Sequence, residues 1–186
     1  MTSLTTKCPR IKLVSFQKTD IDRLIGWIPT AAFLLQWAGP IFYFPLTRQQ
    51  LERHLEKTSA EKPTLLIFKA VDTNTGQVVG HGELANIDYL NSSATLARIL
   101  IGPPEMRGTG IGPEIVHNSL QIAFDILDLH RVDLLVFDFN QQAIRSYEKA
   151  GFVKEGVLRE CRKLEDEYWS SCIMSILEHE WRDRKK

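Results

Sequence analysis

The sequence predicts a single α/β domain, built on a mixed sheet with helices on both faces. Two patterns lead to this fold class. In the first half, two β-rich segments flank the turn DTNTG (72–76), which is typical of a β-hairpin. In the second half, strand and helix patterns alternate, which favours helices that cover a sheet. A length of 186 residues suffices for one hydrophobic core and is short for two, so we expect one domain over 1–186.

The N-terminal quarter begins with a strand pattern. RIKLVSF (10–16) alternates apolar and polar residues, as a half-buried strand does. Thr19 then predicts the cap of a short helix that ends near Pro29. The stretch 31–46 is apolar, rich in aromatic residues and irregular. Two interpretations of it stay open: it packs in the core between two helices, or it forms one wall of a substrate pocket.

The rest of the chain supplies helices and strands in turn. Thr47 and Gln50 have the spacing of a capping box, which predicts a helix over 47–57. Two further helices are predicted by helical spacing and by caps, at 113–129 and 140–152. Strands are predicted at 64–71, 77–88, 93–102, 131–139, 152–164 and 167–177.

Composition narrows the classes of protein to consider. The formal net charge is zero, which excludes a general electrostatic attraction to nucleic acid or to an anionic membrane. Cys8, Cys161 and Cys172 form no CxxC pair and assemble no four-ligand zinc site with the scattered histidines, so we expect neither a disulfide framework nor a metal. The N-terminus lacks the apolar core of a signal peptide, and we expect a cytoplasmic protein.

A glycine-rich loop follows the strand at 93–102. Gly108, Gly110 and Gly112 lack side chains, so the backbone N–H groups between 107 and 112 can meet a ligand closely. We expect the next helix to begin at Gly112 or Pro113, with proline at its first position. The N-terminus of a helix carries partial positive charge. Together these features predict an anion site, most naturally for a phosphate or pyrophosphate, although a glycine-rich turn without a ligand stays an alternative.

Two common phosphate loops fit badly. A Walker loop ends in Gly-Lys-Ser/Thr, whereas this loop ends in Gly-Ile-Gly-Pro and has no lysine for a γ-phosphate. A dinucleotide fingerprint has the spacing GxGxxG after an early strand, and here the spacing is GxGxG. A nucleotide-binding regulatory domain is therefore the weakest of the alternatives for this loop.

The loop and one later segment together resemble a known family. Residues 107–112 (RGTGIG) match R/Q-x-x-G-x-G/A, the acetyl-CoA pyrophosphate loop of the GNAT N-acetyltransferases. NQQAIRSYEKAGF (140–152) looks like the family's Asn-x6-Tyr-Glu-Lys-x-Gly-Phe segment, in the family's order. The ending is similar to the subgroup of ribosomal-protein N-terminal acetyltransferases and spermidine acetyltransferases. The resemblance implies the GNAT fold: a mostly antiparallel sheet of six or seven strands with two splayed central strands.

The resemblance also implies a reaction and a set of site residues. The reaction is acetyl transfer from acetyl-CoA to an amine, by direct attack in a ternary complex and without a metal. Asn140 would contact the cofactor arm, and the hydroxyl of Tyr147 would lie near the sulfur as the acid. Alternatively, Asn140 is a plain helix cap and Tyr147 a core aromatic residue. The remaining cofactor contacts would come from the backbone of Ile99, Leu100 and Ile101 and from Arg107, Gly108, Thr109, Gly110, Ile111 and Gly112.

The general base is where the sequence departs from the family. Relatives that acetylate ribosomal-protein N-termini can carry a glutamate five residues before the asparagine, and here that position is Leu135. The remaining candidates are Glu83, Asp138, or water relayed through backbone carbonyls. His81 shares the parity of Glu83 along its strand and could join such a relay.

The acceptor is less defined than the cofactor. The resemblance suggests a protein N-terminal amine or a polyamine-like small molecule. A polyamine site should be lined with carboxylates, for which ELANID (83–88) and 165–167 are candidates. The alternative from another class is a non-catalytic acyl-CoA-binding module that has lost its base. The aromatic stretch WAGPIFYF (37–44) could form a pocket wall or the surface of a homodimer.

Overall fold

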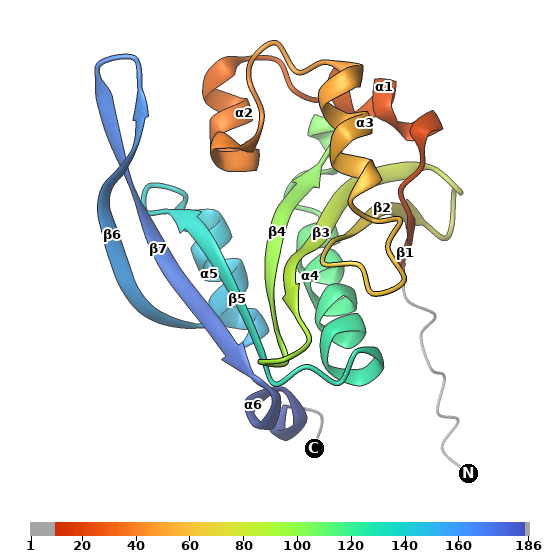
Figure 1. The fold of residues 1–186 in the computed structure, drawn as a ribbon, viewed down its shortest axis with the longest axis vertical. Coiled ribbons are helices and arrows are strands. Elements are labelled where there is room, and N and C mark those ends of the chain that lie inside the picture. The colour runs from red at the N-terminus through yellow and green to blue at the C-terminus, as the bar shows by residue number, and fades with distance from the viewer. Residues whose placement is uncertain (1–9, 185–186) are drawn as a thin grey trace.

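The computed structural model describes residues 10–184, so Cys8 lies outside the described residues. Seven strands form one sheet in the order β1-β2-β3-β4-β5-β7-β6, and the mixed α/β fold class is confirmed (Figure 1). Every neighbouring pair is antiparallel except β4 with β5. The strands are β1 (Ile11–Ser15), β2 (Leu66–Asp72), β3 (Val78–Asp88), β4 (Ser93–Ile101), β5 (Arg131–Phe137), β6 (Val153–Leu164) and β7 (Glu167–Leu177).

The two central strands diverge, as expected. β4 and β5 pair only at Ser93 with Arg131, Ala94 with Val132, and Thr95 with Asp133. Beyond these three pairs β4 stays bonded to β3 and β5 stays bonded to β7. The sheet therefore opens between β4 and β5 toward their C-terminal ends.

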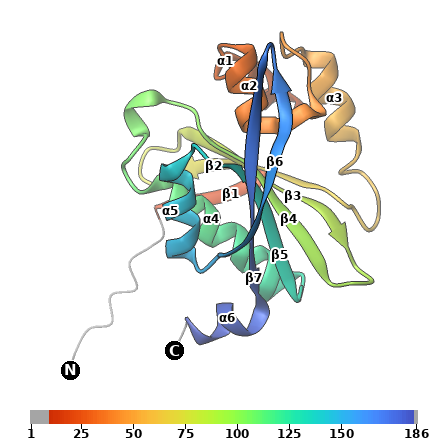
Figure 2. The ribbon, with the colours of Figure 1, turned by 90° about the vertical axis from the view of Figure 1, so that its left-hand side faces the viewer.

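Helices cover both faces of the sheet. On one face lie α1 (Ile21–Gly26), α2 (Ala31–Ala38) and α3 (Arg48–Glu56), packed on residues of β2, β3 and β4. The other face carries α4 (Ile111–Gln121), α5 (Gln141–Ala150) and α6 (Glu178–Asp183), as Figure 2 shows from the side. None of the helices within 10–184 is long and apolar enough to cross a membrane.

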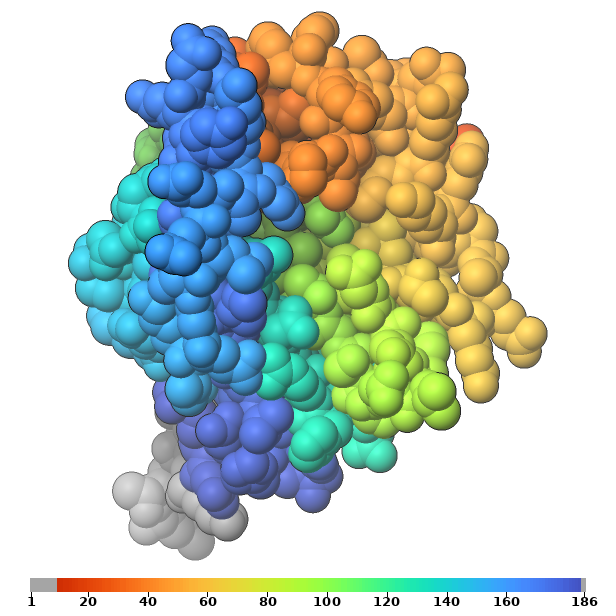
Figure 3. All heavy atoms as spheres, turned by 60° about the vertical axis from the view of Figure 1, so that its left-hand side comes forward, coloured from red at the N-terminus to blue at the C-terminus, as the bar shows by residue number. Residues whose placement is uncertain are grey.

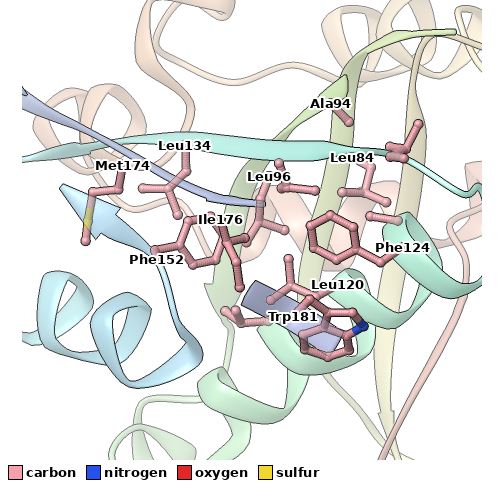
Figure 4. Packing of buried hydrophobic residues seen from close by; sticks show 14 of the residues in the cluster. Leu84, Ala94, Leu96, Leu120, Phe124, Leu134, Phe152, Met174, Ile176 and Trp181 are labelled. Carbon is pink, nitrogen blue, oxygen red and sulfur yellow. The ribbon is translucent and has the colours of Figure 1, made fainter. Parts of the chain in front are cut away.

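The larger core lies under α4 and joins the two halves of the sheet. Leu84 and Leu96 from one half meet Leu134 and Met174 from the other (Figure 4). The C-terminal segment also contributes to this core, although most of its residues are polar. Trp181 of α6, a helix that the sequence does not predict, is only 3% exposed, and its ring stacks on Phe124.

Two local predictions in the N-terminal third are wrong, each for a local reason. Thr19 caps no helix, because it lies inside a short 3-10 helix, Lys18–Asp20, and α1 starts after Asp20. The stretch 31–46 is not irregular throughout: α2 occupies its first half, where the hydroxyl of Thr30 accepts the N–H of Phe33 at 3.1 Å. At Thr47 the N-cap is confirmed, since its hydroxyl accepts the N–H of Gln50 at 3.3 Å. The capping box is not completed, because Oε1 of Gln50 instead accepts the N–H of Tyr43 at 2.8 Å.

The outer edge of the sheet is irregular. β6, the last strand of the order, pairs with β7 as a long two-stranded ribbon. Its register shifts twice, between Lys154 and Gly156 and between Leu158 and Arg162. At the opposite edge, β1 has only five residues.

Candidate functional site

The opening between β4 and β5 holds a cavity of about 570 Å³. Its walls come from β4, β5, α2, α5 and the glycine loop, which are far apart in the sequence. On the face shown in Figure 3, atoms of β4 lie recessed between the β6–β7 ribbon and α2 with α3. The cavity is therefore a product of the divergence of the two central strands.

β4 carries a bulge where it lines the cavity. Ala97 pairs with Glu83 and Leu100 pairs with His81, so two residues of β4 oppose one residue of β3. Arg98 sits in this bulge with φ of +53°, in the left-handed region. Such a backbone conformation is uncommon for a residue with a side chain.

The bulge determines which backbone groups face the cavity. Gly102 donates its N–H to the carbonyl of Val79 on β3, at 3.0 Å. Because N–H groups alternate in direction along a regular strand, Leu100 also faces β3, whereas Ile101 directs its N–H group to the side that β5 has left. Ile99 lies inside the bulge, where this alternation is broken. Ile99, Leu100 and Ile101 all line the cavity.

The glycine loop closes one end of the cavity. Gly108 and Gly110 have φ values of +78° and +91°, which glycine adopts without strain. α4 starts at Ile111, so the expected start at Gly112 or Pro113 is wrong by one or two residues. Gly110 in the left-handed conformation turns the chain into the helix early, and Pro113 is accepted because the first turn needs no N–H donors.

The same loop offers unpaired N–H donors. Within residues 10–184, no acceptor takes the N–H groups of residues 108–112. The guanidinium of Arg107 reaches back to the carbonyls of Ile101 and Gly102, at 3.3 and 3.4 Å, and lies over the ring of Phe33. These donors, at the positive end of α4, suit a phosphate or pyrophosphate.

The cavity is lined by cations. Arg107, Arg145 and Lys149 contribute charged side chains to its walls, and no aspartate or glutamate of the described chain does. Arg98 also lines the cavity, but its guanidinium is paired with buried Glu83. Arg145 and Lys149 lie four residues apart on α5 and so share one face of that helix. Neither has an acidic partner within 4.0 Å among residues 10–184. The cavity is thus suited to a ligand with several negative charges.

α5 brings Asn140 and Tyr147 to the cavity wall. Asn140 caps the helix, since its Oδ1 accepts the N–H of Ala143 at 3.3 Å, and its amide N–H groups stay available to a ligand. The ring of Tyr147 is half-buried and packs edge-on against Phe152. Burial raises the pKa of Tyr147 to about 12, so the hydroxyl is protonated at neutral pH. No described group hydrogen-bonds that hydroxyl.

Glu83 lies elsewhere, in a buried cluster on the α1–α3 face of the sheet. Its carboxylate is 1% exposed and does not line the cavity. Oε2 is 2.8 Å from Nε2 of His54, and Oε1 is 3.0 Å from Nε2 of His81. Nε of Arg98 is 2.7 Å from Oε2. Burial alone would raise the pKa of Glu83, but the charge of Arg98 and the two histidine contacts outweigh it and hold the pKa well below its usual range.

Of the other two positions considered for the base, only Leu135 lines the cavity, and Asp138 does not. Asp138 follows β5, is half-buried and does not line the cavity. Leu135 does line it, with 51% of its surface exposed. An apolar side chain therefore occupies the position at which some relatives would carry a glutamate.

Two further sets of residues line the cavity. Phe33, Gln36 and Trp37 reach it from α2, within the stretch 31–46 for which two interpretations were open: Leu34 and Phe42 pack in the core, and these three neighbours line the cavity. Sequence reasoning missed the second set, the cationic pair on α5. Its signal was two basic residues at i and i+4 in a helix that follows a phosphate loop.

The chain matches the family description "Acetyltransferase (GNAT) domain" over residues 10–153. Among characterised relatives, spermidine N(1)-acetyltransferase of Vibrio cholerae serotype O1 is 33% identical over 109 residues, which is 59% of this chain and 62% of that protein. The Escherichia coli K12 enzyme of the same name is 28% identical over 106 residues, 57% of this chain and 56% of that one. The chain thus aligns with somewhat more than half the length of these relatives.

The three-dimensional likeness is more extensive. The crystal structure of spermidine N-acetyltransferase from Vibrio cholerae, in complex with CoA and spermine, superposes with a TM-score of 0.81 at 25% identity. The superposition covers 93% of this chain and 98% of that one. The splayed strands, the glycine loop and the family match agree with one another, and the chain belongs to the GNAT acetyltransferase family.

Proposed function

We propose that the protein is an acetyl-CoA-dependent N-acetyltransferase, which transfers the acetyl group to a primary amine by direct attack in a ternary complex. One observation carries the proposal: among the described residues, Gly108, Gly110 and Gly112, whose N–H groups have no acceptor, line the same cavity as Tyr147, whose hydroxyl has no hydrogen-bond partner, whereas Thr109 and Ile111 do not line it. The first set suits a pyrophosphate, and the second suits a leaving group that needs a proton. The Vibrio cholerae neighbour, described in complex with CoA, supports the same cofactor here.

Each residue has a role in this proposal. The loop 107–112, with Arg107, binds the pyrophosphate, and Asn140 donates to the cofactor arm. The N–H groups of Ile99 and Ile101 donate to the arm and to the acetyl carbonyl oxygen, on which negative charge develops during attack. The neutral amine attacks the thioester carbonyl, the new C–N bond forms as the C–S bond breaks, and Tyr147 donates its proton to the departing thiolate. The amine loses one proton to solvent, and Tyr147 regains one from solvent.

For the acceptor, a polyamine is the first candidate, since the named relatives are spermidine acetyltransferases. The lining of the cavity favours testing a second class, the α-amine at a peptide N-terminus. No carboxylate of the described residues lines the cavity to attract a polycation or to remove a proton. An α-amine has a pKa of about 7.7–8.0 and is roughly half neutral at pH 8, whereas a lysine-like amine with a pKa of about 10.4 is neutral in only a few molecules per thousand.

Acetyl-CoA-dependent thiol release at pH 8 tests the proposal. The acceptor panel holds spermidine, spermine, an aminoglycoside, a peptide with a lysine and a blocked N-terminus, and peptides with free N-termini. Release with one class identifies the acceptor. Tight CoA binding without release on any amine favours the non-catalytic binding module, and failure to bind CoA contradicts the proposed site itself.

The pH dependence separates the two acceptor classes further. With solvent as the proton acceptor, kcat/KM for a polyamine should rise about tenfold per pH unit up to pH 10, because only the neutral amine attacks. For an α-amine the rise should level off near pH 8. A rise that levels off near pH 6 or 7 with spermidine would instead reveal a protein base.

A homodimer, a single domain over 1–186 and a cytoplasmic location stay predictions. Ile41, Tyr43 and Phe44, which follow α2, are 44%, 79% and 47% exposed and offer an apolar surface to a second copy. Sedimentation of the unaltered chain beside a Tyr43→Ser/Phe44→Ser variant would test the dimer. The expected result is a dimer that the variant converts to monomers.

A further inference from the structure

Arg98, the strained residue of the β4 bulge, is fixed at two points. Its side-chain Nε lies 2.7 Å from Oε2 of Glu83, on β3, as an ion pair. Its backbone carbonyl accepts the indole N–H of Trp37, on α2, at 2.9 Å. A residue with φ of +53° is thus held from two separate elements, one through its side chain and one through its backbone.

Glu83 is itself immobile, which makes it a fixed anchor for Arg98. A carboxylate only accepts hydrogen bonds, so His54 and His81 must both donate from Nε2. His54 belongs to α3 and His81 to β3, and both are less than 10% exposed. The rings of Phe42 and Trp37 pack edge-on against these two imidazoles. The carboxylate therefore cannot turn toward the cavity without breaking several buried contacts.

The bulge matters because it sets the direction of the residues that follow it on β4. One extra residue reverses the alternation of the strand, so the bulge decides whether Ile101 or its neighbours face the gap left by β5. If Arg98 relaxed to an ordinary strand conformation, the N–H group of Ile101 would no longer be held toward the cavity.

We propose that Glu83 is a positioning residue: together with Trp37 it holds Arg98 in the left-handed conformation and so keeps the N–H group of Ile101 directed at the bound cofactor. The inference rests on the proposed function, because it assigns that N–H group to acetyl-CoA. It gives Glu83 a role other than that of general base. The buried Glu83–Arg98–Trp37 arrangement acts on backbone geometry and does not touch the amine.

Two variants of Arg98 separate the backbone role from the role of its charge. Arg98→Ala and Arg98→Gly both remove the guanidinium, but only glycine adopts a positive φ without strain. Titration calorimetry with CoA should show a dissociation constant raised by roughly tenfold in Arg98→Ala, and Arg98→Gly should recover most of that loss. Thermal melting of each variant checks that it is folded.

A double-mutant cycle then tests the part played by Glu83. Glu83→Gln should raise the dissociation constant of CoA by roughly tenfold in the unaltered chain. In the Arg98→Gly chain the rise should be less than twofold, because glycine adopts the left-handed conformation at position 98 without support from Glu83. Trp37→Phe, which keeps an aromatic ring and removes the N–H donor, should weaken CoA several-fold in the unaltered chain and by less than twofold in the Arg98→Gly chain; an equal loss in both would mean that Trp37 acts through the cavity wall that it lines. This variant keeps the test valid if Glu83→Gln does not fold.

Three results would contradict the positioning role of Glu83 or the proposed function, and each can be told from the others. Equal losses of CoA binding in Arg98→Ala and Arg98→Gly would overturn the inference, because the guanidinium itself would then bind the ligand. Glu83 would instead be the base if three results came together in Glu83→Gln. CoA affinity would be unaltered, kcat would fall strongly, and the decline of kcat toward acidic pH would be absent. Failure of the unaltered protein to bind CoA would contradict the proposed function rather than this inference.

Discussion

Replacing Tyr147 with phenylalanine removes one oxygen atom from the cavity wall. The ring contact with Phe152, with centroids 5.7 Å apart, is retained, and no described hydrogen bond is lost. The variant should therefore fold with a melting temperature close to that of the unaltered protein. Any change in kcat would then report on the hydroxyl alone.

The size of the expected effect follows from the environment of the hydroxyl. Proton donation by a positioned acid contributes about 10²–10⁴-fold to a rate. Burial raises the pKa of Tyr147 to about 12, well above that of a thiol at about 8.5, so the group is a weak acid for a thiolate. We therefore expect the low end of the range, a fall in kcat of about 10²-fold, which corresponds to about 2.7 kcal/mol.

The same pKa determines the pH dependence. In the proposed acid role the protonated hydroxyl is the active form, so its contribution to kcat would be present below the pKa of Tyr147 and lost as pH rises through about 12. No decline of kcat that depends on Tyr147 should appear between pH 7 and pH 10. The assay is thiol release under saturating acetyl-CoA and acceptor over this range.

Tyr168→Phe is the matched control, since Tyr168 is 57% exposed on the β6–β7 ribbon and does not line the cavity. A fall in kcat of less than threefold in Tyr147→Phe, with folding intact, would refute the acid role. A decline that is centred below pH 10 in the unaltered chain and absent from Tyr147→Phe would refute the pKa reasoning.

Three other results are expected. We expect Arg145 and Lys149 on α5 to pair with the 3′-phosphate of CoA, which dephospho-CoA lacks. The unaltered protein should therefore bind CoA more tightly than dephospho-CoA in calorimetry, and Arg145→Ala/Lys149→Ala should reduce CoA affinity roughly tenfold or more and abolish that difference. Gly110→Ala should weaken CoA binding and lower the free energy of unfolding by about 1–2 kcal/mol, because φ is +91° at that position. Gly102→Ala should destabilise the fold by about 1–3 kcal/mol in chemical denaturation, because a Cβ there would lie 2.0–2.3 Å from the ring of Trp27.

Matched controls exist for each of these results. Lys154→Ala removes an exposed lysine of β6 that does not line the cavity. It should leave the ratio of the dissociation constants of dephospho-CoA and CoA unchanged. Gly112→Ala has an ordinary φ and a nearest side-chain contact at 3.4 Å, and Gly26→Ala has open space around it. Equal unfolding free energies for Gly110→Ala and Gly112→Ala, or for Gly102→Ala and Gly26→Ala, would contradict the two glycine arguments. A retained cofactor preference in the α5 variant would contradict the charge argument.

The parts of the fold that the sequence predicts are those coded by neighbouring residues. The strands, the helix after Asn140 with its end at Gly151, and the capping of α3 all rest on patterns shorter than a dozen residues, and the structure has each of them. The sequence does not reveal α2, because its aromatic and apolar residues run into Pro40 and give no clear helical period. It does not reveal α6 either, because only Trp181 of the six residues in that helix is buried.

The candidate site divides in the same way. The glycine loop and the Asn140–Tyr147 spacing are local patterns, and the sequence alone displays both. It does not display the surroundings of Glu83, because their contacts join residues that are distant in the chain: His54 is 29 positions away, and Trp37 reaches Arg98 across 61 positions. A carboxylate in a strand sequence carries no sign of whether it faces a ligand or a buried arginine. Only the folded pairing of β3, β4, α2 and α3 distinguishes the two.

The irregular outer edge of the sheet has a consequence for how the protein behaves in a crowded solution. A long, regular edge strand presents unpaired backbone groups on which a second chain can add a strand. β6 is twelve residues long and carries exposed Val153, Val157 and Leu158, which would favour such growth. Its two register shifts break the row of backbone groups, and the charged residues Glu155, Arg159 and Glu160 lie within the shifted stretches, where exposed charge disfavours the addition of a strand. With only five residues in β1 at the other edge, the open sheet is protected at both ends from growing into a fibre.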